Sequence, residues 1–200
     1  DWAQTHASGE WQIFLGGDDG LQPYFFELAD KLTTIAKKEN IRTITSKRAY
    51  FFWKNCASYH NNTAVSYYAE KKVSIENCDK QMYRCIYGKR ECSFFDLPQM
   101  YTTSLFHVSL LEEVRDKQDG VLLPIRILGQ DFQLAALALG IEDRFLQSNI
   151  PIGWVGTSSK GLPYFDISIE DIDIAYTHKI FSYDLIFWYV LISLIHVWKP

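Results

Sequence analysis

The sequence predicts a single α+β domain, spanning residues 1–200, in which antiparallel sheets are flanked by helices. A chain of 200 residues is long enough for one domain with a real core, because roughly 70% of the chain surface can be buried at this size. Hydrophobic residues make up 48% of the chain and charged residues 22%, which excludes disorder as the main state. The spacing of apolar residues switches between helical and strand periods along the chain, which indicates mixed secondary structure.

A strand, a turn, a helix and a second strand are predicted for the first 45 residues. Residues 11–15 have the composition of a short strand, and the Gly- and Asp-rich residues 16–20 predict a plain turn. Apolar residues then recur at spacings of 3, 4 and 3, as on one face of a helix that continues through Lys38. This helical face comprises Phe25, Leu28, Leu32 and Ile35. Asn40 can end the helix, and residues 41–45 alternate apolar and polar residues as a half-buried strand does.

Residues 46–103 are predicted to form an insertion, with short strand-like runs such as residues 49–53, and they hold all four cysteines of the chain. The cysteines are Cys56, Cys78, Cys85 and Cys92. Their spacing contains no C-x-x-C pair, so no zinc site is expected. Two disulfides would suit a secreted protein, as would the glycosylation sequon at Asn61. Buried free thiols are the alternative, since cysteine is among the most buried side chains, and the spacing does not decide between the two.

The same region carries basic residues interleaved with tyrosines. The basic residues are Lys71, Lys72, Lys80, Arg84, Lys89 and Arg90, and the tyrosines are Tyr67, Tyr68, Tyr83 and Tyr87. The net charge of -4 creates no overall attraction for a polyanion, so nucleic-acid binding would need such a local patch. Acidic residues dilute the cluster and favour a solvated mixed-charge surface.

The middle of the chain is predicted to be strand-rich. Residues 104–110 alternate so that His107 and Ser109 lie on one side of a strand. Residues 121–128 and 132–139 are two apolar runs separated by Gly-Gln-Asp, which predicts a hairpin. The alanines within residues 134–139 keep a helix open as the alternative.

The remainder of the chain is predicted as a loop, a strand and a buried segment. Residues 149–161 are rich in Gly, Ser and Pro and are predicted to be a loop, and residues 164–169 alternate as a strand does. Residues 185–198 are strongly apolar but fall short of the roughly 20 residues that a bilayer span needs. We therefore expect a buried strand or helix there and no membrane span.

Two of these predicted strands could carry chemistry together. His107 and Ser109 share one face of the first, and Asp166 and Ser168 share one face of the second. If the strands are adjacent in one sheet, the four side chains converge on a cleft. A histidine can transfer protons near neutral pH, and hydroxyl groups can hold phosphate oxygens.

Residues 106–110 resemble the first H-x-[ST] motif of the 2H phosphoesterase superfamily. Residues 121–139 resemble the middle of the cyclic phosphodiesterase domain of fungal tRNA ligases, and the similarity spans about residues 104–184. The second H-x-[ST] motif matches Asp166-Ile167-Ser168, in which aspartate stands in place of histidine. An ionised aspartate could act as a general base but would repel the phosphate that it must approach.

The resemblance implies a bilobal sheet fold that acts on a 2′,3′-cyclic phosphate or a similar diester of a nucleotide or RNA end. The catalytic residues that it implies are His107, Ser109, Asp166 and Ser168. His178 and Tyr164 are assigned to substrate binding, and no metal ion or other cofactor is expected. The alternative is a secreted, disulfide-stapled binding module without catalytic activity, which the cysteine cluster, the Asn61 sequon and the many Tyr and Trp residues suggest. The compartment and the oligomeric state stay open.

Overall fold

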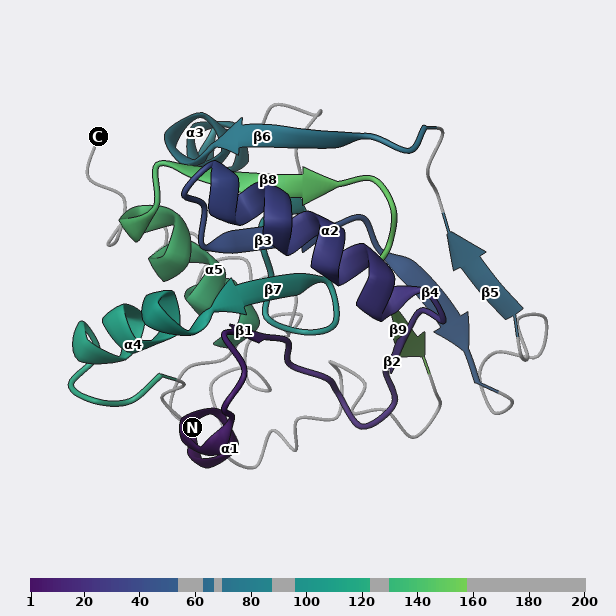
Figure 1. The fold of residues 1–200 in the computed structure, drawn as a ribbon, viewed down its shortest axis with the longest axis horizontal. Helices are drawn as coiled ribbons and strands as arrows, with labels where there is room; N and C mark the ends of the chain where they lie inside the picture. Colours follow the sequence, from purple (N-terminus) through teal and green to yellow (C-terminus); the bar gives the residue numbers. More distant parts are fainter. Residues whose placement is uncertain (54–62, 67–69, 88–95, 123–129, 158–200) are drawn as a thin grey trace, which may run out of the picture.

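The computed structural model describes residues 1–53, 63–66, 70–87, 96–122 and 130–157. These residues form helices and strands arranged in two sheets, which confirms the predicted α+β class (Figure 1). The helices are α1 (Trp2–His6), α2 (Phe25–Lys38), α3 (Cys78–Ile86), α4 (Val108–Asp116) and α5 (Gln130–Ile141).

The larger sheet has five strands in the order β1-β7-β3-β8-β6. Their bounds are Trp11–Gln12 for β1, Ser104–His107 for β7, Thr43–Ser46 for β3, Arg144–Ser148 for β8 and Val73–Asn77 for β6. β3 and β8 run parallel, while the other neighbouring strands of this sheet run antiparallel.

The smaller sheet has four strands in the order β2-β9-β4-β5. Their bounds are Gly20–Leu21 for β2, Gly153–Thr157 for β9, Ala49–Phe52 for β4 and Thr63–Ser66 for β5. β4 and β9 are parallel, so both sheets are mixed and the prediction of purely antiparallel sheets is wrong. A parallel pair requires a crossover connection, and residues 47–143 supply one between β3 and β8.

Helices cover both faces of the larger sheet. α2 lies in front of it in Figure 1 and buries Leu32 and Ala36 against Ile44 and Leu146. On the opposite face, α3, α4 and α5 pack around Phe106 of β7 and Phe145 of β8. In β7 and β8, consecutive residues therefore face apolar clusters on opposite sides of the sheet, as the period-2 geometry of a strand requires.

The opening of the chain follows the prediction closely. α2 ends at Lys38, and Asn40 adopts a left-handed backbone conformation with φ of 54°, which asparagine tolerates at a helix end. The predicted turn at residues 16–20 is held by the Asp19 carboxylate, which accepts hydrogen bonds from the Gly16 N–H (3.1 Å), the Gly156 N–H (2.9 Å) and the Thr102 hydroxyl. The Asp19 carboxylate therefore has a structural role in this turn.

Three predicted elements in the second half are wrong. The strand predicted at residues 104–110 ends at His107, where α4 begins. The hairpin arm predicted at residues 132–139 is part of the helix α5, which was the open alternative for residues 134–139. The loop predicted at residues 149–161 contains β9, which pairs with both β2 and β4.

The described part of residues 46–103 is built into the rest of the fold. It provides β6 to the larger sheet and β4 and β5 to the smaller one, and Cys78, Met82 and Cys85 of α3 belong to the core. That residues 46–103 are an insertion stays a prediction.

The side chains of Cys78 and Cys85 are buried. Cys56 and Cys92 lie outside the described residues. Burial raises the pKa of the Cys78 thiol, and the nearby carboxylates of Glu142, Asp79 and Asp143 raise it further.

We therefore expect the Cys78 and Cys85 thiols to be unreactive toward Ellman's reagent in the native protein, because neither is exposed and the Cys78 thiolate is disfavoured. Both should react once the protein is unfolded in guanidinium without a reductant. Mass spectrometry of the labelled peptides identifies each site. Finding either cysteine unlabelled in the unfolded, unreduced protein would show that it is disulfide-bonded and would favour the secreted binding module.

No helix among the described residues combines the length and the apolar character that crossing a membrane requires. Residues 164–169 and 185–198, for which strands or a buried segment are predicted, lie outside the described residues.

Candidate active site

His107 lies at one end of the larger sheet, beside the ends of its neighbouring strands. β7 ends at His107, opposite Trp11 at the start of β1, and Phe106 lies opposite Thr43 at the start of β3. β8 begins at Arg144, opposite Asn77 at the end of β6. This end, the His107 edge, is on the left of the sheet in Figure 1, and α3 and α4 both begin there. Residues far apart in the sequence are thus brought side by side.

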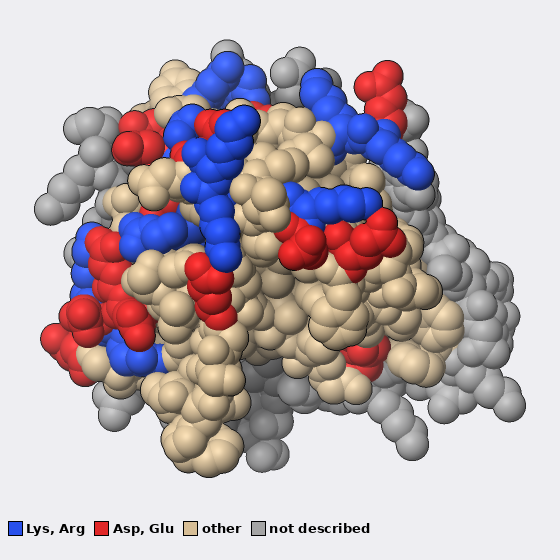
Figure 2. Space-filling view, in the orientation of Figure 1, with Lys and Arg blue, Asp and Glu red and all other residues tan. Residues whose placement is uncertain are grey.

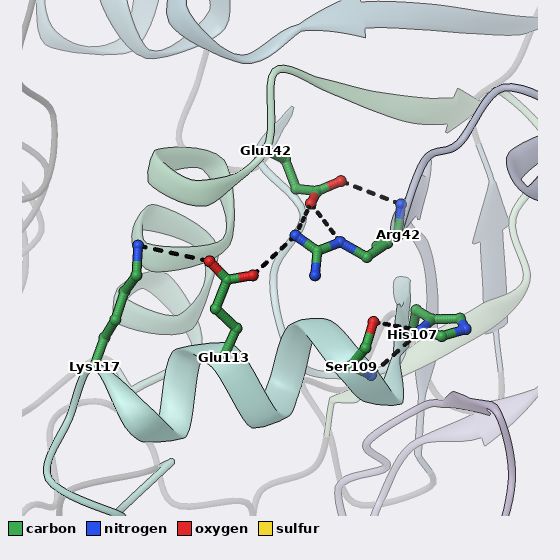
Figure 3. A network of polar contacts seen from close by, with 6 residues as sticks. All are labelled: Arg42, His107, Ser109, Glu113, Lys117 and Glu142. Atoms are coloured by element: carbon green, nitrogen blue, oxygen red, sulfur yellow. Dashed lines mark hydrogen bonds and ion pairs between the residues drawn. The ribbon is translucent and has the colours of Figure 1, made fainter.

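His107 joins β7 to α4 and caps the helix with its own side chain. Its backbone is extended, with φ of -69° and ψ of 140°, and its Nδ1 accepts a hydrogen bond from the Ser109 N–H at 3.2 Å. A side-chain acceptor at this position satisfies one of the backbone N–H groups that the first helical turn leaves without a partner. The Ser109 Oγ lies 2.8 Å from the same Nδ1 (Figure 3). The capping turn therefore brings the two predicted site residues together.

The hydrogen bonds assign the ring proton of neutral His107. Because Nδ1 accepts the Ser109 N–H, the proton is on Nε2, which faces the Glu10 Oε1 at 3.4 Å. The imidazole is partly buried, with 23% of its side-chain surface exposed. Its Nε2 therefore lies toward solvent as a hydrogen-bond donor, while Nδ1 is turned into the helix start.

Glu10 and its neighbours surround the outer side of the imidazole. The Glu10 carboxylate pairs with Lys37 of α2 at 2.7 Å, and the indole of Trp11 meets the imidazole edge-on at 5.3 Å between ring centroids. The hydrogen bond from Lys37, and then that from His107, lower the pKa of the Glu10 carboxyl. Both Glu10 and Lys37 are about half exposed, so this ion pair is weak and can be displaced at little cost.

Arg42 connects the same edge to α4 and α5 (Figure 3). Its guanidinium contacts Glu142 at 2.6 Å and Glu113 at 3.1 Å, and its backbone N–H donates to the Glu142 Oε2 at 3.2 Å. The Arg42 carbonyl in turn accepts the His107 N–H at 2.9 Å. Partial burial disfavours the charged guanidinium, but the two carboxylates outweigh it and raise the pKa of Arg42.

An open surface pocket of about 470 Å³ lies beside this network. Its lining is polar and comes from the end of α2, the start of β3 and the turn between α5 and β8. The lining residues are Asn40, Arg42, Ile141, Glu142, Asp143 and Arg144. The pocket and His107 share Arg42, whose side chain lines the pocket and whose carbonyl holds the His107 backbone.

The structure places only part of the predicted site. His107 and Ser109 are in hydrogen-bond contact, and a helix cap brings them together in place of the predicted strand alternation. Asp166, Ser168, Tyr164 and His178 lie outside the described residues. In the part of the chain that the structure describes, no three His, Cys, Asp or Glu side chains lie together as a metal site would require.

Sequence reasoning missed the charged residues of this edge, which are Glu10, Lys37, Arg42, Glu113 and Glu142. Arg42 and Glu142 are 100 residues apart in the chain, and Arg42 and Glu113 are 71 apart. No local pattern reports such pairs. Only Arg42 could have been noticed in the sequence, because it is a charged residue near the start of the strand predicted at residues 41–45.

No protein-family model matches this sequence, and neither does any curated protein.

Proposed function

We propose that this chain is a phosphoesterase of the 2H type that binds and cleaves a cyclic phosphate or phosphodiester at a nucleotide or RNA end, with His107 as general acid. The observation that carries the proposal is the placement of His107 at the sheet edge, with Nδ1 held against Ser109 and Nε2 turned outward. A protonated imidazole that is fixed at Nδ1, and whose Nε2 faces only an exposed and displaceable carboxylate, can transfer a proton to a leaving oxygen.

Protonation of His107 is compatible with its contacts. A protonated Nδ1 can donate to the Ser109 Oγ at 2.8 Å, in place of accepting the Ser109 N–H. Nε2 then keeps its proton for the substrate. Ser109 therefore orients the acid form of the imidazole, and the Glu10 carboxylate lies beside Nε2.

Substrate phosphate would displace Glu10 from Nε2. This exposed side chain can swing away, which leaves the Lys37 ammonium available as a phosphate partner. Glu10 is paired with Lys37, Glu142 with Arg42, and Glu113 with both Arg42 and Lys117, so these three carboxylates are neutralised by cations.

The proposed reaction has two proton transfers. Water attacks phosphorus as Asp166, the proposed base, takes a proton from it, and the bond between phosphorus and the leaving 2′ or 3′ oxygen breaks. That oxygen takes the proton from Nε2 of His107, and a phosphate monoester is left. In the bilobal arrangement that we propose, Ser168 would accompany Asp166 from the second lobe, and Tyr164 and His178 would contact the substrate.

A second candidate function is ester hydrolysis with Ser109 as the nucleophile. It is favoured by one observation, the chain of contacts from the Ser109 Oγ through His107 to the Glu10 carboxylate, at 2.8 and 3.4 Å. In the neutral tautomer, Nδ1 can accept the hydroxyl proton while Glu10 orients the ring.

Replacing Ser109 by alanine separates the two functions. If Ser109 only orients His107, Ser109→Ala should lower the rate of 2′,3′-cyclic nucleotide hydrolysis about tenfold, the effect of one lost hydrogen bond of about 1.4 kcal/mol. If Ser109 is the nucleophile, hydrolysis of a p-nitrophenyl ester should be lost entirely. The proposal collapses if the purified parent neither binds nor cleaves cyclic-phosphate nucleotides.

A further inference from the structure

Helix α3 has a buried face and an opposite face that carries only cations and aromatic rings. Cys78, Met82 and Cys85 point into the core, where they pack against α5. The opposite face is formed by four residues at positions i, i+3, i+4 and i+7, namely Lys80, Tyr83, Arg84 and Tyr87. This spacing places all four side chains along one stripe of the helix.

The two tyrosines of this face are paired and exposed. Their ring centroids are 4.5 Å apart with planes tilted by 37°, and 48% of Tyr83 and 62% of Tyr87 are exposed to solvent. Two adjoining aromatic rings at the surface form a platform onto which a flat, unpaired base can stack. A base within a duplex does not offer its face in this way, so the platform suits a single strand.

Positive charge borders the platform. Lys80 is exposed and Arg84 half-buried on α3, whereas the exposed Lys71 and Lys72 lie at the other end of β6 from α3. Glu70, Asp79 and Glu76 lie among them, and Figure 2 shows blue and red side chains mixed along the upper edge, over the positions of α3 and β6. By its helical position Asp79 is on the flank of α3, so the stripe itself carries two cations and no acid.

The start of α3 contacts the turn that lines the pocket of the candidate active site. The Cys78 N–H donates to the Asp143 carbonyl at 2.9 Å, and the Asn77 side chain donates to the same oxygen at 3.4 Å. Asp143 lines the pocket that Arg42 shares with the His107 edge.

We infer that the exposed face of α3 is a docking surface for single-stranded RNA, with bases stacked on Tyr83 and Tyr87 and phosphates paired with Lys80 and Arg84. The choice of RNA over DNA rests on the proposed function. The cations supply affinity without sequence preference, and the rings select unpaired over paired strands.

The test is fluorescence anisotropy of the full chain with a labelled 12-nucleotide single-stranded RNA, measured at 50 and 200 mM salt. We expect the parent to bind, and to bind a duplex of the same sequence at least tenfold more weakly. The double variant Tyr83→Ala, Tyr87→Ala should weaken single-strand binding at least tenfold. The double variant Lys80→Glu, Arg84→Glu should weaken it at least tenfold and reduce its dependence on salt.

Two substitutions on α2 are matched controls, because they remove the same chemistry from another surface. Phe26 is 81% exposed and Lys38 is exposed, so Phe26→Ala and Lys38→Glu should bind RNA as the parent does. Circular dichroism of every variant shows whether the fold is kept. Because Tyr83 and Tyr87 are exposed, their truncation should leave the melting curve unchanged.

The inference is overturned if the parent does not bind the single strand, if folded α3 variants bind it as tightly as the parent, or if the duplex binds equally well. Tighter binding of single-stranded DNA, or binding to phosphatidylserine vesicles in place of RNA, overturns the choice of partner. If the parent cleaves cyclic nucleotides but does not bind the single strand, the result counts against this surface alone. Retained RNA binding without any cleavage counts against the proposed function alone.

Discussion

Replacing His107 by asparagine is expected to abolish cleavage of a 2′,3′-cyclic nucleotide while leaving α4 intact. The asparagine Oδ1 can accept the Ser109 N–H, as Nδ1 does in the parent at 3.2 Å, so the helix cap is kept. An amide cannot donate a proton to a leaving oxygen. Losing a general acid costs about 10²- to 10⁴-fold in rate. Hydrolysis rates and guanidinium unfolding curves, measured on the same preparations, check both halves of this prediction.

Two further variants separate the cap from the proton transfer. His107→Ala should lose the same activity and also about 1 kcal/mol of stability, because the cap acceptor is gone. His6→Ala removes an exposed histidine of α1 and should behave as the parent. If His107→Asn were as destabilised as His107→Ala, the helix cap described for His107 would be wrong.

Replacing Arg42 by methionine is expected to lower the free energy of unfolding by about 2 to 3 kcal/mol. Methionine keeps much of the packing of the arginine stem but removes the charge that Glu142 and Glu113 share. The side chain of Glu142 is only 8% exposed, so its carboxylate would be left buried without its cation. Breaking a fully buried pair costs about 3–5 kcal/mol, and the 30% exposure of Arg42 reduces this figure. The midpoint of guanidinium unfolding measures the change.

Arg144 provides the matched control, since it lines the same pocket but is nearly half exposed and pairs with Glu39 at 3.7 Å. Arg144→Met should cost less than about 1 kcal/mol. The double variant Arg42→Met, Glu142→Leu should be more stable than Arg42→Met alone, because no charge is then stranded. Equal losses of unfolding free energy for Arg42→Met and Arg144→Met would contradict the stabilising role assigned to the ion pairs of Arg42 with Glu142 and Glu113.

The first part of the fold could be predicted because its signals are local. α2 buries one stripe and exposes the other, so its apolar period is visible, and Asn40 marks its end. α5 was harder to predict for a physical reason. Leu134 and Ala138 face one apolar cluster while Ala135, Ala136 and Leu139 face another, so the helix is apolar on opposite sides and carries no period. A continuous apolar run of this kind is equally compatible with a buried strand.

The strand predicted to hold both His107 and Ser109 is wrong, yet the two side chains lie close together. An H-x-S spacing places two side chains on one face of a strand. The same spacing fits a helix start in which the histidine is the N-cap and the serine is the second helical residue, as His107 and Ser109 are in α4. Both geometries bring His107 and Ser109 close, so the pair could be predicted although the element could not. The ion pairs of Arg42 depend on how β3, α4 and the start of β8 meet, which no local pattern in the sequence records.

The rate of opening of a 2′,3′-cyclic nucleotide near pH 7, compared between the parent and His107→Asn, tests the central claim most directly. We predict measurable turnover by the parent and a rate at least a hundredfold lower for His107→Asn, with both proteins equally folded. Equal rates for the two proteins, or no turnover and no binding by the parent, would contradict the assignment of His107 as the general acid of a phosphoesterase.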